Sequence, residues 1–306
     1  MPAGPSVEIV EVGPRDGLQS EPSVLPTASK VEFIRRAIGA GLRRIEVASF
    51  VNPAKVPQMA DAEAVLAALA PPGDLHYVGL VLNRRGFERA AAAGCNEIGM
   101  AVMASDTFNR RNQGVSTGDS IAAWLDIAAA ARASGIRAQV TISTAFGCPF
   151  EGEVPVERVL EIARRVAAAQ PHEIALADTI GAGVPAQVEE LVGRVREALP
   201  GVRLRCHFHN TRNTGLANAY AAVRSGVAAL DASLGGIGGC PFAPAATGNI
   251  ATEDLVYMLQ RCGYATGVVL DSAIAVGRWL QQQIGRPVPG MLVKAGAFPA
   301  ARAPAA

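Results

Sequence analysis

The sequence predicts a (β/α)8 barrel, a ring of eight parallel strands surrounded by helices, in a single domain with a core over about residues 7–285. Short β-rich runs alternate with amphipathic segments in one unbroken series. Such alternation is typical of right-handed βαβ units and a parallel sheet. Eight units in about this length indicate a closed barrel. An open doubly wound sheet is the alternative, but no Gly-x-Gly-x-x-Gly turn follows the first strand.

The first half of the chain contains five expected strands and four expected helices. The strands are Val7 to Val12, Arg44 to Ser49, His76 to Leu82, Glu97 to Met103 and Arg137 to Ser143. The helices are Thr27 to Ala40, Val56 to Ala70, Arg84 to Ala93 and Ser116 to Ser134. In the first helix, Val31, Ile34 and Ile38 form one apolar stripe. Glycine or Pro-Pro-Gly just beyond the helices is an ordinary stop signal.

The second half continues the alternation. Its expected strands are Glu173 to Ala177, Val202 to Phe208 and Ala228 to Ser233, and its helices are Pro155 to Ala169, Pro185 to Leu199 and Thr211 to Ser225. Proline opens two of these helices, and a glycine follows the third. Two further helices are expected, Thr252 to Cys262 and Ser272 to Ile284. The Ala/Pro-rich residues 287–306 are expected to be poorly ordered.

The amino-acid composition argues against several classes of partner and site. The net charge is +1 and aromatic residues make up 5%, so neither a polyanion nor single-stranded nucleic acid is an expected partner. Residues 232–252 carry no charge but contain five glycines and two prolines, so we expect a loop and no membrane partner. The first six residues lack the features of a secretory signal. Five scattered cysteines without a Cys-x-x-Cys pair favour neither disulfides nor structural zinc, and cytoplasmic location is expected.

Two histidines end the seventh expected strand, in the segment VRLRCHFHN (202–210). Successive strand side chains point to opposite faces, so His207 and His209 project from one face about 7 Å apart. Neutral imidazoles placed in this way can bind one metal ion if other parts of the chain add oxygen ligands. Taken alone, such a pair is more often just two histidines on a half-exposed strand, but this pair is not isolated.

Further polar residues follow other strands at their carboxyl ends, where the active sites of parallel barrels lie. They are Arg15 and Asp16 after the first strand, Glu46 in the second, Asp178 after the sixth, and Cys240 and Asn249 after the eighth. Their arrival at one rim favours a mixed nitrogen and oxygen shell for a hard or borderline divalent ion.

Each of these residues also has a purely structural interpretation. The two residues after the first strand could form a local ion pair. Glu46 could pair with Arg43 or Arg44. Asp178 could cap the turn that follows it, and Asn249 could cap the helix expected from Thr252.

The chain resembles 3-hydroxy-3-methylglutaryl-CoA lyases from Val7 to about Gly285. The matching stretches are VEIVEVGPRDGLQSE, IEVASFVNPAKVPQMAD, FGCPFEG, ADTIGAG, HFH, GGIGGCPFAPAATGN and ATEDLVYML. The loop GGIGGCPFA is the most specific, because the wider superfamily shares the RDG and His-x-His elements without it. The sequence is therefore identified as a member of this lyase family.

The resemblance implies a (β/α)8 barrel with extra C-terminal helices and a divalent cation, Mg²⁺ or Mn²⁺. The implied ligands are Asp16, His207, His209 and Asn249. The implied reaction is the retro-Claisen cleavage of 3-hydroxy-3-methylglutaryl-CoA to acetyl-CoA and acetoacetate. The cation would lower the pKa of the substrate hydroxyl so that a base can remove its proton.

The resemblance also implies roles for single residues. Asp16 or His207 would be the base, and Arg15 would stabilise the enolate that forms. Cys240 would return a proton to the enolate, with Cys148 in a similar Gly-Cys-Pro-Phe segment as its rival. Glu46 and Asp178 would orient ligands and substrate. The glycines around Ile237 are interpreted as a flexible lid.

The expected partner is an acyl-CoA substrate. Residues expected to bind the substrate or its CoA part are Arg15, Gln19, Asn83, Arg110 and Arg111. Arginines that follow the third and fourth strands could meet phosphates at the rim, with solvated surface arginines as the alternative. We also expect a homo-oligomer, namely a dimer.

One segment departs from the family pattern. After the histidines the family usually continues with Asp-Thr, whereas this chain has Asn210-Thr211-Arg212-Asn213. Arg212 could meet an extra carboxylate or face solvent. The alternative substrates are citramalyl-CoA and a longer branched homologue. The alternative functions are a Claisen-type synthase, which condenses acetyl-CoA with a 2-oxoacid, and a barrel that binds CoA esters without catalysis.

Overall fold

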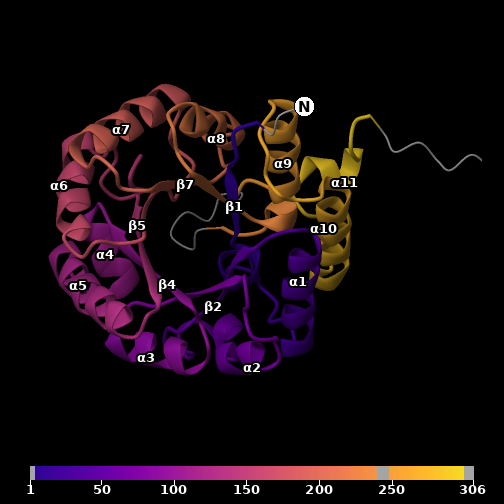
Figure 1. Cartoon of the computed structure of the whole chain (residues 1–306), viewed down its shortest axis with the longest axis horizontal. Helices are drawn as coiled ribbons and strands as arrows, with labels where there is room; N and C mark the ends of the chain where they lie inside the picture. Colours follow the sequence, from indigo (N-terminus) through magenta and orange to yellow (C-terminus); the bar gives the residue numbers. More distant parts are fainter. Residues whose placement is uncertain (1–3, 240–247, 300–306) are drawn as a thin grey trace, which may run out of the picture.

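The computed structural model describes residues 4–239 and 248–299, and its strands close into a parallel barrel surrounded by helices (Figure 1). The strands are β1 (Glu8–Glu11), β2 (Arg44–Ser49), β3 (His76–Leu80), β4 (Glu97–Met103), β5 (Arg137–Ser143), β6 (Glu173–Asp178), β7 (Leu204–Phe208) and β8 (Ala229–Ala232). Their order around the ring is the order of the sequence, and β8 pairs with β1. The predicted (β/α)8 barrel is confirmed.

The helices lie outside the ring of strands. They are α1 (Thr27–Gly39), α2 (Ala62–Ala67), α3 (Arg84–Ala92), α4 (Asp106–Gln113), α5 (Thr117–Ala133), α6 (Val156–Ala167), α7 (Pro185–Ala198), α8 (Gly215–Arg224), α9 (Thr252–Arg261), α10 (Leu270–Ile284) and α11 (Met291–Ala295). Three short turns are η1 (Gly13–Gly17), η2 (Pro57–Met59) and η3 (Leu234–Gly236). In the part of the chain described, no helix has the length and apolar character needed to cross a membrane.

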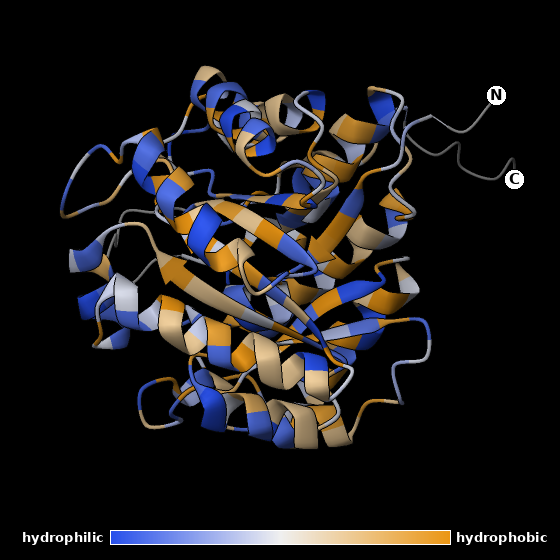
Figure 2. Ribbon diagram, turned by 60° about the vertical axis from the view of Figure 1, so that its left-hand side comes forward, coloured by the Kyte–Doolittle hydropathy of each residue, from blue (hydrophilic) through white to orange (hydrophobic). Residues whose placement is uncertain are grey.

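The main hydrophobic core lies between the strands and the surrounding helices. Ile45, Ile98 and Val140 on the strands are fully buried, as are Ile127 and Val159 on helices. Figure 2 shows hydrophobic residues (orange) along the strands and on the adjoining helices. Alternation along each strand leaves the opposite set of side chains for the barrel interior.

One expected helix is divided in the structure, and one helix of the barrel was not expected. The helix expected over residues 56–70 is divided into η2 and α2. At the division, Lys30 of α1 binds both the carbonyl oxygen of Gln58 and the carboxylate of Asp61 at 2.5 Å. Helix α4 was not predicted. Ser105 caps its start by accepting a hydrogen bond from the backbone of Phe108, and the left-handed Gly114 ends it.

The expectation of a poorly ordered tail after Arg286 is wrong for residues 287–299. Val288 is 1% exposed and packs against Gly235, and Gly290 donates a backbone hydrogen bond to the carbonyl oxygen of Gly235 at 2.9 Å. Val293 in α11 is also buried. These apolar contacts fix the segment against the loop after β8. Residues 300–306 lie outside the described part.

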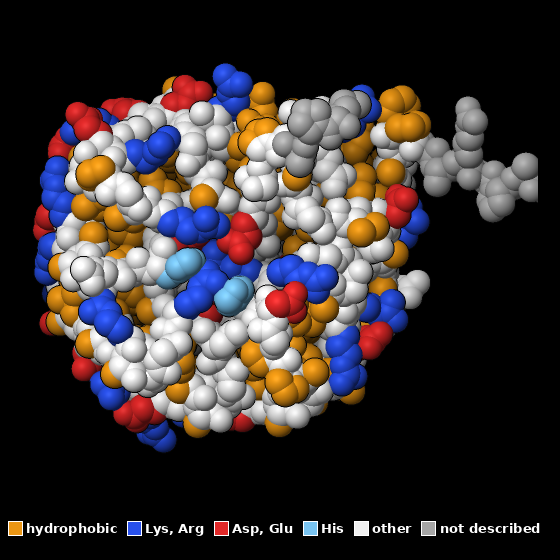
Figure 3. All heavy atoms as spheres, in the orientation of Figure 1, with side chains coloured by type: hydrophobic (Ala, Val, Ile, Leu, Met, Phe, Trp, Pro, Cys, Tyr) orange, Lys and Arg blue, Asp and Glu red, His pale blue; other side chains and the backbone are white. Residues whose placement is uncertain are grey.

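The amino-terminal end of the barrel interior is filled by charge. Glu8, Arg44, Glu97 and Glu173 stand at the first positions of their strands, and Arg44 pairs with Glu97 at 2.5 Å and with Glu173 at 3.0 Å. All but Glu8 are completely buried. Figure 3 shows this face, with basic, acidic and histidine side chains gathered at its centre.

Candidate active site

A cavity of about 650 Å³ opens at the carboxyl ends of the strands. Its lining includes the polar residues Arg15, Asp16, Gln19, Glu46, Lys55, Asn83, Gln139, Arg205, His207, His209 and Asp231. These side chains come from six of the eight strands or the loops that follow them. Of the residues predicted at the rim, Arg15, Asp16, Glu46, His207 and His209 therefore line one cavity.

Three of the predicted cation ligands converge. Asp16, His207 and His209 each offer a ligand atom, and these atoms lie within 4.8 Å of one another. The two imidazole rings project from the end of β7 with their centroids 5.0 Å apart. The prediction that the two histidines share one face is confirmed.

Asn249, the fourth predicted ligand, adjoins this group. Its Nδ2 donates to Oδ2 of Asp16 at 2.9 Å and to the carbonyl oxygen of Ile237 at 3.0 Å. Its Oδ1 is buried and has no hydrogen-bond partner among the described residues. Nδ1 of His209 is likewise buried without a partner in that part of the chain. Buried polar atoms normally have hydrogen-bond partners. An amide oxygen and an imidazole nitrogen that lack them here are suitable ligands for a divalent cation.

The backbone explains how Asn249 reaches a site built from β1 and β7. His209 forms a bridge with Asn249, and Ile250 donates to the carbonyl oxygen of Phe208 at 3.2 Å. Gly248, with φ of 99°, is required at this return, since a Cβ there would lie 2.5 Å from the carbonyl oxygen of Gly238.

Asp16 and Arg15 are presented by η1, a single π-helical turn that follows β1. The amide of Asp16 donates to the carbonyl oxygen of Val12 at 2.7 Å. Oε1 of Glu11 accepts hydrogen bonds from the amides of Gly13 and Leu234, both at 2.9 Å. One buried carboxyl group therefore ties this turn to the start of the glycine-rich loop after β8.

Arg15 bridges two carboxylates. Its Nε and Nη2 lie 2.7 and 2.5 Å from Oε2 of Glu46, and its Nη1 donates to Oδ1 of Asp16 at 2.8 Å. The alternative that Glu46 pairs with Arg43 or Arg44 is wrong, because Arg44 points to the opposite end of the barrel interior. Glu46 holds the guanidinium in place on the cavity wall.

The surroundings set the charges of the cation ligands. Burial raises the pKa of Asp16, but Arg15 and the two histidines outweigh it and the pKa is lowered. Burial and the charge of His207 lower the pKa of His209 to about 3. Asp16 is therefore ionised and His209 neutral near pH 7, which are the forms that bind metal.

Asp178 holds a turn instead of facing the cavity. Its Oδ1 accepts from the amide of Ala182 at 2.8 Å and its Oδ2 from the amide of Gly183 at 2.9 Å. It is fully buried and is absent from the described lining of the cavity. The structural interpretation, a cap on the turn between β6 and α7, is the one that the geometry supports.

Cys240 lies outside the described residues. Gly239, just before it, lines the cavity, and its carbonyl oxygen accepts from Oγ of Ser20 at 3.3 Å. Ile237 is fully buried, and Gly235 donates to Oε2 of Glu253 at 3.0 Å. The first half of the supposed lid is therefore anchored to the barrel.

Cys148, the rival thiol, is located away from the cavity. It is 3% exposed and clusters with Met103 and Phe108. Its Sγ lies 3.0 Å from Oγ of Ser105, the cap of α4. Within the described residues it does not line the cavity, so its position favours packing.

The residues predicted to bind CoA fall into two groups. Gln19 and Asn83 line the cavity, and Oε1 of Gln19 is buried without a partner in the described residues. Arg110 instead pairs with Asp106 at 2.7 Å, and the guanidinium of Arg111 lies 4.3 Å from the ring centroid of Phe150. Neither arginine is part of the described lining.

Lys55 lines the cavity and was missed in the sequence. It is exposed, and its ammonium makes no hydrogen bond or ion pair with any described residue. The other cations of the lining are already matched, Arg15 by Glu46 and Arg205 by Asp231. Its position in the loop after β2 was the signal that could have identified it.

The residues that depart from the family pattern lie beside the site. Oδ1 of Asn210 accepts from the amide of Gly215 at 3.1 Å. Arg212 is exposed, donates to the carbonyl oxygens of Ile180 and Gly181, and does not belong to the described lining. This geometry favours the solvent-facing interpretation of Arg212 over contact with a substrate carboxylate.

Several known proteins resemble this chain over most of its length. The family described as HMGL-like matches residues 6–279. The chain is 46% identical to the (R)-citramalyl-CoA lyase of Chloroflexus aurantiacus over 95% of each protein, and 43% identical to the hydroxymethylglutaryl-CoA lyase of Pseudomonas mevalonii over 92% of this chain and 93% of that one. The structure of an HMG-CoA lyase from Acinetobacter baumannii in complex with coenzyme A and 3-methylmalate superimposes with a TM-score of 0.93, at 39% identity and 97% coverage of both chains.

Proposed function

This chain belongs to the HMGL-like family and is a carbon–carbon lyase, and we propose that it cleaves 3-hydroxy-3-methylglutaryl-CoA to acetyl-CoA and acetoacetate. The observation that carries the proposal is the convergence of Asp16, His207 and His209 at the cavity beside the Arg15–Glu46 pair. The identity of the cation, Mg²⁺ or Mn²⁺, is part of the proposal.

The cation would be held by Asp16, His207, His209 and Asn249, and when bound it supplies Lewis acidity that acidifies the tertiary hydroxyl of the substrate. Asp16 takes the hydroxyl proton, because His207, the other expected base, has its Nδ1 engaged by Asp231 and its Nε2 directed at the cation. The bond between the carbinol carbon and the thioester α-carbon then breaks, and its electron pair forms the enolate of acetyl-CoA.

Arg15 stabilises the enolate oxygen. Its guanidinium is fixed by Glu46 and Asp16, so the positive charge is in place before the negative charge develops. The Cys240 thiol returns a proton to the enolate carbon. The other product, acetoacetate, carries the new ketone.

A second candidate is cleavage of citramalyl-CoA. It is favoured by the 46% identity to a citramalyl-CoA lyase over 95% of both chains. The two thioesters share the tertiary alcohol, the methyl group and the carboxylate, and differ by one methylene. A hydrophobic pocket discriminates such a difference by only about 1–3 kcal/mol, so the chain need not be strictly specific.

The direct test is release of acetyl-CoA, with Mg²⁺ present, from a panel of 3-hydroxyacyl-CoA thioesters. If 3-hydroxy-3-methylglutaryl-CoA is cleaved fastest, the first proposal is supported. If citramalyl-CoA or a longer homologue is cleaved fastest, that thioester is the substrate instead. A preference for condensing acetyl-CoA with a 2-oxoacid would identify a synthase. Tight binding of the thioester without turnover would refute catalysis.

We propose that Lys55, together with Gln19 and Asn83, binds the anionic part of the CoA ester. The support is that its ammonium has no partner among the described residues and lies on the cavity lining, whereas Arg110 and Arg111 lie off that lining. Lys55→Met should raise KM several-fold with little change in kcat, since the contact is made before and during the reaction. Arg110→Met is the matched control and should change neither; a larger effect of the control would restore the original assignment.

The homodimer and the cytoplasmic location remain predictions. Sedimentation velocity of the purified chain at micromolar concentration would check the first, and a monomer that turns over substrate at full rate would contradict it. Fractionation of cells that express the chain would check the second.

A further inference from the structure

Asp231 of β8 is a buried carboxylate that the proposed reaction does not use. It is 4% exposed and lines the cavity. Its Oδ2 lies 3.1 Å from Nδ1 of His207, and its Oδ1 accepts a hydrogen bond from Nη1 of Arg205. Asp231 therefore stands between a histidine of the cation site and a guanidinium deeper in the barrel.

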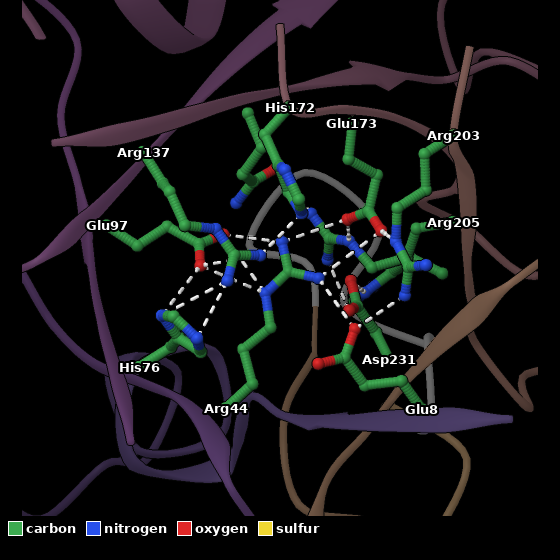
Figure 4. A network of polar contacts seen from close by, with 12 residues as sticks. Glu8, Arg44, His76, Glu97, Arg137, His172, Glu173, Arg203, Arg205 and Asp231 are labelled. Atoms are coloured by element: carbon green, nitrogen blue, oxygen red, sulfur yellow. Dashed lines mark hydrogen bonds and ion pairs between the residues drawn. The ribbon is translucent and has the colours of Figure 1, made fainter. Parts of the chain in front are cut away.

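Arg205 is itself held by several groups (Figure 4). Its Nε donates to Oε1 of Glu173 at 2.7 Å and its Nη2 to Oε1 of Gln139 at 2.5 Å. Glu173 in turn pairs with the fully buried Arg44. A guanidinium with this many fixed partners has no room to rotate, so it fixes the orientation of Asp231.

We propose that Asp231 is a positioning residue, which accepts the Nδ1 proton of His207 and thereby presents Nε2 to the cation shared with Asp16 and His209. This inference rests on the proposed cation site. A neutral imidazole donates from one nitrogen and offers a lone pair on the other. Because an ionised carboxylate can only accept, the proton of His207 must lie on Nδ1 and the lone pair on Nε2.

The contacts of Asp231 support this arrangement. Its Oδ1 is paired with the guanidinium of Arg205, which leaves Oδ2 directed at Nδ1 of His207 as an acceptor. His209 lacks such a partner within the described residues, because its Nδ1 is buried and unpaired. Among the described residues, a carboxylate therefore orients His207 but not His209 before the cation arrives.

The chemistry of arginine makes Asp231→Asn a sharp test. Arginine can only donate, so the oxygen of the new amide must face Arg205. Its NH₂ group then faces Nδ1 of His207 and requires an acceptor there. The substitution should therefore move the imidazole proton to Nε2, where it points at the cation. Loss of such an orienting partner lowers metal affinity by 10–100-fold in other sites.

The first measurement is a Mn²⁺ titration followed by electron paramagnetic resonance, without substrate. Asp231→Asn should weaken Mn²⁺ binding by about 10–100-fold. Glu97→Gln is the matched control, since Glu97 is a fully buried carboxylate of the same network that pairs with Arg44 and not with His207. It should change the affinity by less than about threefold. Unchanged binding in Asp231→Asn, or equal losses in both variants, would overturn the proposal.

The second measurement needs no variant. The chain contains four histidines, so ¹⁵N-histidine labelling gives a resolvable NMR spectrum. In the Mg²⁺-saturated wild type, the proton of His207 should be on Nδ1; a proton on Nε2 would overturn the proposal even if Asp231→Asn does not fold. Neither readout involves turnover. A chain that passes both tests but cleaves no 3-hydroxyacyl-CoA would refute the proposed function alone.

Discussion

At the scale of single residues, Arg15 depends on the shape of its side chain as well as on its charge. Its three nitrogens reach Glu46 and Asp16 together. Lysine offers one compact ammonium and cannot hold both carboxylates in this geometry. Arg15→Lys should therefore lower kcat by an amount equivalent to about 3–4 kcal/mol in the barrier. Steady-state kinetics at saturating Mg²⁺ measures the effect, and turnover within about twofold of wild type would remove Arg15 from its proposed role.

Separate substitutions of Cys240 and Cys148 can distinguish the roles of these two thiols. Cys240→Ala should suppress product formation by orders of magnitude while Mn²⁺ binding stays intact, because the thiol is proposed to move a proton and not to bind the cation. Cys148→Ala should leave kcat unchanged and cost about 1 kcal/mol of stability, since Cys148 is packed with Met103 and Phe108. Activity assays and thermal unfolding of both variants distinguish the roles; loss of turnover only in Cys148→Ala would reverse them.

At the scale of elements, hydrophobic periodicity predicts the strands well and the irregular segments poorly. All eight strands were placed to within a few residues, because Val- and Ile-rich runs are buried on both faces. Helix α4 was missed because DTFNRRNQ has few apolar residues, and its ends depend on the cap Ser105 and on Gly114. The Ala/Pro-rich composition after Arg286 predicts disorder, yet the side chain of Val288 is deeply buried and holds the start of this segment against the barrel.

The contact between η1 and the glycine-rich loop is a second prediction at this scale. A Cβ on Gly17 would lie 2.6 Å from Cγ1 and 2.8 Å from Cδ1 of Ile237, which is fully buried and cannot retreat. Gly17→Ala should push Ile237 outward, and with it the carbonyl oxygen that orients Asn249. We expect roughly 10-fold weaker Mn²⁺ binding and a stability loss of about 1–3 kcal/mol.

The control for this substitution is Gly193→Ala in α7. Gly193 is exposed, and a Cβ there would meet no atom within 4 Å. Alanine should leave turnover unchanged and stabilise the chain by about 0.5–1 kcal/mol, because it favours the helix. Titration of Mn²⁺ and denaturant unfolding of both variants check the pair. Normal Mn²⁺ affinity in Gly17→Ala would show that the loop is not held through this contact.

At the scale of the whole molecule, the sequence predicted the closed barrel and the set of residues at its carboxyl-terminal mouth, but not the charged interior. The ligand residues were identifiable because they stand at strand ends and in family motifs. Arg44 could not be assigned from sequence, because Glu46, two positions along the same strand, was as plausible a partner as Glu97 or Glu173. Only closure of the ring brings the first residues of β2, β4 and β6 together.

The fold also buries two carboxyl groups, Glu253 and Glu11, and these make global stability depend on pH. Burial raises the pKa of Glu253 from 4.5 to about 8, and its Oε1 is without a hydrogen-bond partner among the described residues. Burial likewise raises the pKa of Glu11 to about 7. Both groups bind a proton more tightly in the folded chain than in the unfolded chain.

The sign of the effect follows from linkage. A raised pKa contributes stability that is fully present below the unfolded value near 4.5 and is lost as the pH rises toward the folded value near 8. Glu253→Gln removes this contribution but keeps an oxygen for the amide of Gly235. The free energy of unfolding of the wild type, relative to the variant, should therefore fall by a few kcal/mol between pH 5 and pH 8.5. Urea unfolding in EDTA excludes cation binding and measures this difference; curves that run parallel across the range would mean that Glu253 is ionised in the folded chain.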